Sequence, residues 1–372
     1  MITQIPDRQP LIQLNAVDKI YQTPAGSFTA LKGVSVDFYH GEFVSVQGKS
    51  GSGKSTLMNM ITGIDHPTAG TVRVGDEFVH KMKESQMAIW RGRNLGIVFQ
   101  FFQLLPTLTV LENVLIPMDL GNCYSPDQRE GIALQLLDRL GLVDEADKMP
   151  AELSGGQQQI AAIARALAND PPILIADEPT GNLDSRAADK VFQIFDEMAG
   201  QGRMILMVTH DQTIAKRTQR QLIISDGELI NEVISNAFQE INHSDLLILN
   251  RAAKKIKLIP GEVLRPIDYG MIIIESGRVE MVLEQNDQRT KLPFLEPGGI
   301  IPITENYSTE LLATDQAEAS LLLIDENTIK DWVNRSELAR SLLEDKKSNL
   351  LSLIAGARNS DALYQPGSEK RS

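Results

Sequence analysis

Residues 48–56 read GKSGSGKST, and they come directly after a segment, residues 42–47, that has the character of a buried strand. The residues that follow Lys54 have helical spacing, which ends near Pro67. Glycines between a strand and a helix let the backbone curl so that several N–H groups point at one anion, and the helix dipole adds to the attraction. The strand, the glycine loop and the helix together predict a phosphate-binding loop.

Every residue of this loop is a candidate nucleotide contact. Lys54 is placed to reach the β- and γ-phosphates, and the hydroxyl of Ser55 is placed to ligate Mg²⁺. The rest of the loop would line the phosphates: Gly48, Lys49, Ser50, Gly51, Ser52, Gly53 and Thr56. A flexible Gly/Ser turn is the alternative, and the flanking strand and helix argue against it.

A second apolar segment, ILIADEP at residues 173–179, ends a short strand with two adjacent acids. Asp177 would hold Mg²⁺ through water, and Glu178 would polarise an attacking water. Adjacent acids after a strand are, by themselves, as often solvated loop charge. The phosphate-binding loop earlier in the chain favours the metal and water roles.

A third segment, LSGGQ at residues 153–157, opens a helix. Its hydroxyl and bare N–H groups suit an anion for the same reason as the first loop: Ser154, Gly155, Gly156 and Gln157. One chain does not need two anion-binding segments, the glycine loop and LSGGQ, for one γ-phosphate. We therefore expect each chain to offer this segment to ATP held by a second copy of itself, in a homodimer.

The arrangement of these motifs over residues 11–232 resembles the ABC ATPase family. The resemblance implies that Tyr21 stacks on adenine, that Gln100 in VFQ senses the metal and faces a transporter, and that His210 in VTHD lies near the γ-phosphate. It also matches Asp184 in GNLD to the D-loop aspartate of the family. Plainer roles stay open, because Tyr21 would also serve for packing, Gln100 as a polar loop residue and His210 as an ordinary strand end.

Residues 99–117, FQFFQLLPTLTVLENVLIP, look most like the ABC subfamily that serves lipoprotein-release, macrolide-efflux and cell-division permeases. This resemblance implies ATP and Mg²⁺ as cofactors, an integral membrane permease as partner, and a cytoplasmic place on the inner face of the cell membrane. Two residues depart from the family. Lys49 stands where a proline or similar residue is common, and Ile160 replaces the arginine of LSGGQQQR, which would weaken contacts at the dimer interface.

The expected fold of residues 1–235 is α/β. Short apolar strands such as ILIAD alternate with helices such as residues 185–200, which is typical of a parallel sheet core. The family resemblance adds an antiparallel β subdomain and a helical subdomain at about residues 100–170. The whole is a P-loop NTPase of the ABC type.

From residue 236 to 358 the chain resembles a cyclic-nucleotide-binding β-roll with flanking helices, and residues 359–372 read as a flexible tail. Residues 237–256, AFQEINHSDLLILNRAAKKI, are expected to be helical. The segment that would bind the nucleotide, residues 300–320, has no Lys or Arg and carries Glu305, Glu310, Asp315 and Glu318. A buried anion would lack its counter-charge there, so cyclic nucleotide binding is not expected. A role in contacts or regulation is favoured over a surviving nucleotide site or a site for another small ligand.

Composition narrows the function classes. The chain has 372 residues and a formal charge of −13, and both halves are acidic, which disfavours nucleic acid as the main partner. No apolar run approaches the ~18 residues of a membrane-spanning helix, and the N-terminus has no signal pattern. The single cysteine, Cys123, excludes an internal disulfide and is expected to be a small buried hydrophobe.

Two rival functions remain. One is a soluble ABC ATPase that acts on nucleic acid or ribosomes, although such proteins often carry two cassettes or a long coiled coil. The other is a sensor ATPase that is regulated through its C-terminal β-roll.

Overall fold

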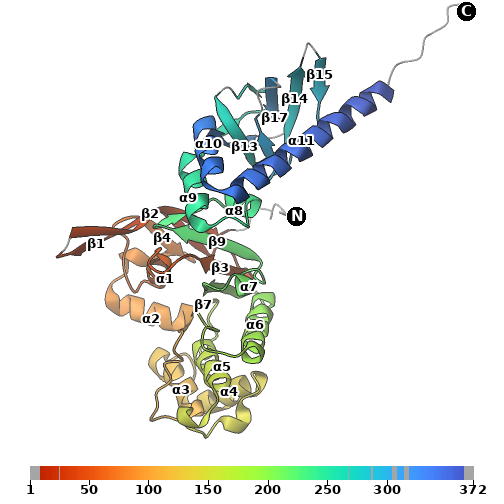
Figure 1. The fold of residues 1–372 in the computed structure, drawn as a ribbon. Helices are drawn as coiled ribbons and strands as arrows, with labels where there is room; N and C mark the ends of the chain where they lie inside the picture. Colours follow the sequence, from red (N-terminus) through yellow and green to blue (C-terminus); the bar gives the residue numbers. More distant parts are fainter. Residues whose placement is uncertain are drawn as a thin grey trace, which may run out of the picture. The chain divides into compact units, whose positions relative to one another are not determined.

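The computed structural model describes residues 9–363 apart from 25, 267, 286–287, 304–307 and 314–317. The chain forms two compact units, of which one ends at Leu229 and the other begins at Ile230. Figure 1 shows the first unit in red to green and the second in green to blue. Among the described residues, no helix has the length and apolar character to cross a membrane.

The centre of the first unit is a six-stranded sheet in the order β10-β9-β3-β8-β7-β6. Its strands from β9 to β6 are parallel, and β10 is antiparallel to β9. The strands are β3 (Phe43–Gln47), β6 (Leu95–Val98), β7 (Ile173–Asp177), β8 (Met204–Val208), β9 (Arg220–Ser225) and β10 (Glu228–Leu229). Every residue of β3 and β8 is buried, as expected for apolar strands covered on both faces. Three helices belong to this part: α1 (Lys54–Thr62), α6 (Ser185–Gly200) and α7 (Gln212–Ala215).

An antiparallel sheet in the order β2-β1-β4-β5 shares its core with the parallel sheet. Its strands are β1 (Ile12–Thr23), β2 (Gly26–Phe38), β4 (Ala69–Val74) and β5 (Glu77–Phe78). Leu14 and Phe38 from this sheet pack in one apolar cluster with Val46 and Leu57. This cluster fixes α1, and so the loop before it, against both sheets.

The helical part of the first unit contains α2 (Glu84–Asn94), α3 (Val110–Gly121), α4 (Pro126–Arg139) and α5 (Gly155–Leu167), with short 3₁₀ turns at Val79–Lys81, Val143–Glu145 and Pro150–Glu152. Thr109 caps α3 and accepts a hydrogen bond from the backbone N–H of Glu112, whose side chain in turn bonds the backbone of Thr109. Ile160 is 4% exposed and belongs to the apolar core of α3 to α6, so it packs like a core residue. Cys123 is half-buried rather than buried, and its Sγ donates a hydrogen bond to the carbonyl of Gly121 at 3.6 Å.

The second unit contains two antiparallel sheets of four strands each, in the orders β11-β18-β13-β16 and β12-β17-β14-β15. The first sheet has β11 (Lys254–Leu258), β18 (Ala319–Asp325), β13 (Tyr269–Ser276) and β16 (Ile300–Pro302). The second has β12 (Val263–Leu264), β17 (Ser308–Ala313), β14 (Val279–Gln285) and β15 (Gln288–Lys291). Helices α8 (Glu232–Ala237) and α9 (His243–Ala252) precede the sheets, and α10 (Glu326–Arg335) and α11 (Glu337–Leu363) follow them.

Three boundaries differ from the sequence expectation. The second unit begins at Ile230 rather than 236, because α8 packs on α9 and β13. Residues 254–256, which were expected to be helical, form β11 because they pair with residues 321–323 of β18. Helix α11 continues to Leu363, past the predicted start of the tail at 359, and the rest of that tail lies outside the described residues.

Candidate nucleotide site

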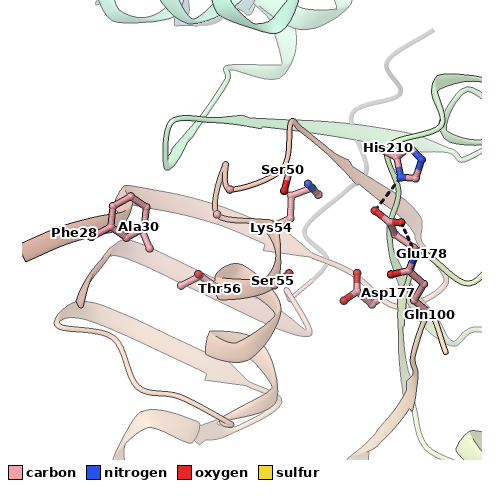
Figure 2. Close-up of a pocket in the computed structure, with 12 residues that line it drawn as sticks. Phe28, Ala30, Ser50, Lys54, Ser55, Thr56, Gln100, Asp177, Glu178 and His210 are labelled. Carbon is pink, nitrogen blue, oxygen red and sulfur yellow. Dashed lines mark hydrogen bonds and ion pairs between the residues drawn. The ribbon is translucent and has the colours of Figure 1, made fainter. Parts of the chain in front are cut away.

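A cavity of about 590 Å³ lies where the loop before α1 meets the carboxyl ends of β6 to β8. Figure 2 shows its side chains, which come from five separate segments of the chain. Its lining residues are Phe28, Ala30, Ser50, Gly51, Gly53, Lys54, Ser55, Thr56, Gln100, Asp177, Glu178 and His210. Pockets of 300–1,000 Å³ are typical of small-molecule and cofactor sites, so a nucleotide fits this volume.

The loop between β3 and α1 is held close to its neighbours by two glycines. A Cβ at Gly48 would lie 2.3 Å from the carbonyl oxygen of Ile224, and one at Gly53 would lie 2.6 Å from that of Ala30. Gly53 also has a φ of 111° as the N-cap of α1, a conformation that L side chains rarely adopt. No side chain of the described residues caps α1, so its first N–H groups are available to an anion.

Lys54 supplies the positive charge of the site. Its Nζ donates hydrogen bonds to the carbonyl oxygens of Gly48 (2.8 Å) and Lys49 (3.0 Å), so the ammonium group folds over the loop. Burial lowers the pKa of Lys54, and the negative charges of Glu178 and Asp177 oppose this effect. The uncapped helix, the glycine loop and this ammonium group suit a phosphate chain.

Asp177 ends β7 and faces the cavity opposite Ser55 (Figure 2). Burial raises the pKa of its carboxyl group, the charge of Glu178 raises it further, and Lys54 lowers it. Within the part of the chain that is described, no group of three or more His, Cys, Asp or Glu is placed to hold a metal ion. A metal at this site would therefore depend on Asp177, a neutral oxygen such as that of Ser55, and the phosphates of the ligand.

The carboxylate of Glu178 is held at both of its oxygens. Gln100 Nε2 donates to Oε2 at 3.1 Å, and His210 Nδ1 lies 2.9 Å from Oε1 (Figure 2). Glu178 also has a φ of 46°, in the left-handed region that is uncommon for residues other than glycine. Its N–H donates to the carbonyl of Val208 in β8, and this bond helps to hold the strained backbone.

Tyr21 and Phe28 face each other across β1 and β2, but they relate differently to the cavity. The Tyr21 hydroxyl donates to Asp65 Oδ2 at 2.9 Å, and Lys19 Nζ lies 4.8 Å from the Tyr21 ring centroid. Tyr21 is outside the cavity lining, whereas Phe28 is part of it and is 54% exposed. Phe28 is not predicted from the sequence, because its place beside Tyr21 depends on the register of the β1–β2 hairpin.

The LSGGQ segment and Asp184 lie away from this cavity. Ser154 caps α5, and Gln157 N donates to its Oγ at 3.3 Å. Asp184 caps α6 and accepts a hydrogen bond from the backbone N–H of Ala187 at 2.9 Å. Gly155 approaches Leu183, and a Cβ at Gly156 would lie 2.9 Å from Ala187 Cβ, so this segment is packed against the start of α6.

Comparisons with known proteins agree with this geometry. Residues 31–181 match the family model described as ABC transporter. The chain is 41% identical over 220 residues to the uncharacterized ABC transporter ATP-binding protein YknY of Bacillus subtilis, which covers 59% of this chain and 95% of that protein. It is 42% identical over 221 residues to the macrolide export ATP-binding/permease protein MacB 1/2 of Paracoccus denitrificans, covering 59% of this chain and 33% of that protein.

Solved structures give the same result. The dimeric structure of MJ0796, a bacterial ABC transporter cassette, is 41% identical with a TM-score of 0.55, over 59% of this chain and 96% of that one. A dimeric post-hydrolysis state of the same cassette, bound to ADP and Pi, is 40% identical with a TM-score of 0.55 and the same coverage.

Proposed function

This chain belongs to the family of ABC transporter ATP-binding proteins, and we propose that it works as a homodimer whose Mg²⁺-dependent ATP hydrolysis drives an integral membrane permease. It is an ATPase of the ABC type. The observation that carries the proposal is the carboxylate of Glu178, which is fixed between Gln100 and His210 beside the phosphate-binding loop.

The nucleotide would be bound by the loop before α1 and by the hairpin of β1 and β2. The first N–H groups of α1 and the ammonium group of Lys54 would bind the β- and γ-phosphates. Adenine would contact Phe28, and Tyr21 would supply the second aromatic if its hydroxyl leaves Asp65. The loop residues that line the cavity would contact the phosphates, and they are Ser50, Gly51, Gly53, Lys54, Ser55 and Thr56. Gly48, Lys49 and Ser52, which were also expected to contact the nucleotide, are outside this lining.

Ser55, Asp177 and Gln100 would hold Mg²⁺, directly or through water. The ion neutralises charge on the phosphate oxygens when it is bound. Asp177 must be ionised for this, and its raised pKa makes the site sensitive to acid.

Glu178 would take the proton of the attacking water. Because Gln100 and His210 bond different oxygens of its carboxylate, the group is oriented before water arrives. His210 lines the same cavity, so it would also lie near the γ-phosphate of bound ATP.

The homodimer accounts for the segment that faces away from its own cavity. Ser154, Gly155, Gly156 and Gln157 present a helix N-terminus, and Asp184 lies beside it at the start of α6. Each chain would offer these residues to ATP on its partner. The relative MJ0796 is a cassette whose solved structure is dimeric, which supports this assembly.

A groove of about 350 Å³ is the proposed docking site for the permease. It is lined by Arg91 and Gly92 of α2, Phe99, Pro117 of α3, and Arg165 of α5. Large apolar side chains close in sequence to these residues are exposed, namely Ile89 (58%) on α2, Phe101 (69%) after β6 and Leu120 (85%) on α3. Arg91 is paired with Glu84, and Arg165 donates to the carbonyls of Phe102 and Gln103, so the apolar side chains offer the main contact surface. Such a patch fits the apolar face of an amphipathic helix, and Phe99 connects it to Gln100.

The permease would place the protein on the inner face of the cell membrane. The relative MacB is named as an ATP-binding and permease protein in one chain, which supports a membrane partner. The second unit, with its two antiparallel sheets, would be a β-roll of the cyclic-nucleotide-binding type that serves contacts or regulation.

Glu178→Gln tests the proposal. The amide keeps the size of the side chain but cannot take a proton, so turnover should fall at least about 100-fold, the lower range for loss of a general base. ATP binding should persist, and gel filtration with ATP should show a stable dimer. Glu197→Gln, an exposed residue on α6, is the matched control and should keep wild-type turnover. A Glu178→Gln protein with near-normal turnover would refute the proposal.

A further inference from the structure

A second cavity, of about 250 Å³, lies within the second unit between α11 and the segment that leads into β16. Helix α11 packs against β15 and β16, and Figure 1 shows it running along this side of the sheets. The wall of the cavity is apolar and includes Met281, Leu295, Ile301 and Leu350. Leu353, at the rim, is 46% exposed, so the cavity opens to solvent.

Two polar side chains of α11, Lys346 and Asn349, also line this cavity. They lie three residues apart, and Leu350 and Leu353 follow at positions i+4 and i+7 from Lys346, so all four share one helix face. Lys346 is half-buried and has no ion-pair or hydrogen-bond partner for its ammonium group among the described residues. Because the rest of the cavity wall is largely apolar, an anion in the cavity would lose water and would gain from the ammonium group of Lys346.

The acidic residues around the cavity do not neutralise the ammonium group of Lys346. No carboxylate of the described residues lines the cavity. Glu296, next to Leu295, is paired with Arg278 at 3.1 Å. Glu344 and Asp345 are exposed and lie two residues and one residue before Lys346, on other faces of the helix.

We propose that this cavity binds a small amphiphilic monoanion, a carboxylate on an apolar body, with its head at Lys346 and Asn349. The volume equals about eight waters at ~30 Å³ each, which sets the ligand at roughly eight to ten non-hydrogen atoms. The apolar body would lie against Met281, Leu295 and Leu350. The carboxylate of such a ligand would pair with the ammonium group of Lys346.

A cyclic nucleotide fits less well. Its ribose and phosphate need several donors, and the cavity supplies the side chains of Lys346 and Asn349. Glu310, in the segment expected to hold the nucleotide, is buried and bonds Arg265 Nη2 at 2.6 Å, so that arginine is already engaged. Glu318 is exposed, and Glu305 and Asp315 lie outside the described residues.

Calorimetric titration of the full chain without ATP is the test, with octanoate below its micelle concentration as the probe. Octanoate should bind, and octanamide should bind at least about tenfold more weakly, because a charge-assisted contact is worth about 1.5–3 kcal/mol, or roughly ten- to a hundredfold. Lys346→Met should weaken octanoate by the same factor. Lys347→Met, half-buried next to it but outside the cavity lining, should leave affinity unchanged.

Several outcomes would overturn the proposal. They are no binding of octanoate, equal loss in both variants, or tighter binding of cyclic AMP than of octanoate. A shift from dimer to monomer in Lys346→Met with no change in octanoate affinity would show that a second copy covers the cavity instead. Thermal melting checks that both variants fold, and Lys346→Gln replaces Lys346→Met if the latter does not.

Discussion

The two acids at the end of β7 differ at the scale of single residues. Both carboxylate oxygens of Glu178 are bonded, one to Gln100 and the other to His210. By contrast, burial and the charge of Glu178 raise the pKa of Asp177. One carboxylate is thus oriented for proton transfer and the other is left to meet a cation. The adjacent positions take separate roles because Asp177 is the last residue of β7, whereas Glu178 follows the strand with a φ of 46° and is bonded to Gln100 and His210.

The raised pKa of Asp177 predicts an unusual acid sensitivity. As pH falls from about 8 to about 5, Asp177 should protonate earlier than an ordinary aspartate, so the Mg²⁺ concentration for half-maximal hydrolysis should rise. The Mg²⁺ dependence of ATPase activity across this range is the measurement. Asp196→Asn, an exposed control on α6, should follow the wild type. A profile with no change in Mg²⁺ requirement would contradict the role of Asp177.

The same shift has a consequence for stability without ligand. A carboxyl whose folded pKa is raised binds its proton more tightly in the folded state, so its contribution to stability is present below that pKa and is lost as pH rises through it. The site therefore carries an unfavourable ionised Asp177 at neutral pH, which a bound cation relieves.

Phe28 leads to a prediction about adenine. Base–aromatic stacking is worth about 1–3 kcal/mol, so Phe28→Ala should raise the KM for ATP by about fivefold or more. Inhibition by inorganic triphosphate, which has no base, should be unchanged. Phe78→Ala, a 41% exposed phenylalanine on β5, is the control. If Tyr21→Ala raises the KM and Phe28→Ala does not, adenine stacks on Tyr21, as expected from the sequence, and not on Phe28.

At the scale of elements, the sequence predicts what local chemistry determines. The strand before the glycine loop was expected at 42–47 and is found at Phe43–Gln47, and α1 begins at Lys54 as expected. Glycine conformations and a helix start need no distant partner. By contrast, β11 exists because its residues pair with residues 319–323, more than sixty positions later, so local helical spacing gave the wrong result. Phe28 was missed for a related reason, since its place depends on strand register.

The LSGGQ element predicts a complementation result. If it serves the partner's ATP, a mixed dimer of a Lys54→Ala chain and a Ser154→Arg chain has one intact site and should hydrolyse ATP. A mixed dimer of a doubly substituted chain and a wild-type chain has a defect at both sites and should be inactive. ATPase activity of the two purified mixed dimers is the measurement, and each is the control for the other. The opposite ranking would mean that Ser154 acts on ATP of its own chain.

At the scale of the whole molecule, these apolar clusters each lie within one of the two units. The buried residues of the first unit's clusters lie within residues 11–224, and those of the cluster that includes the second unit's sheets lie within 258–354. YknY is matched over 95% of its length by 220 residues of this chain, so the remainder has no counterpart in that protein. The cassette is therefore expected to be complete without the second unit.

Removal of the second unit separates the permease-driving ATPase from the sensor alternative. A chain that ends at Leu229 keeps both of its cores and every residue around Lys54, so its turnover should stay within about threefold of the full chain, as for a domain with its own core. Steady-state hydrolysis of the two proteins is the measurement, and circular dichroism with thermal melting checks that the shorter one is folded. A folded but inactive short chain would show that the second unit controls hydrolysis. The protein would then be an ATPase whose output depends on the state of that unit, and octanoate, the probe for its cavity, would be the first compound to test on turnover.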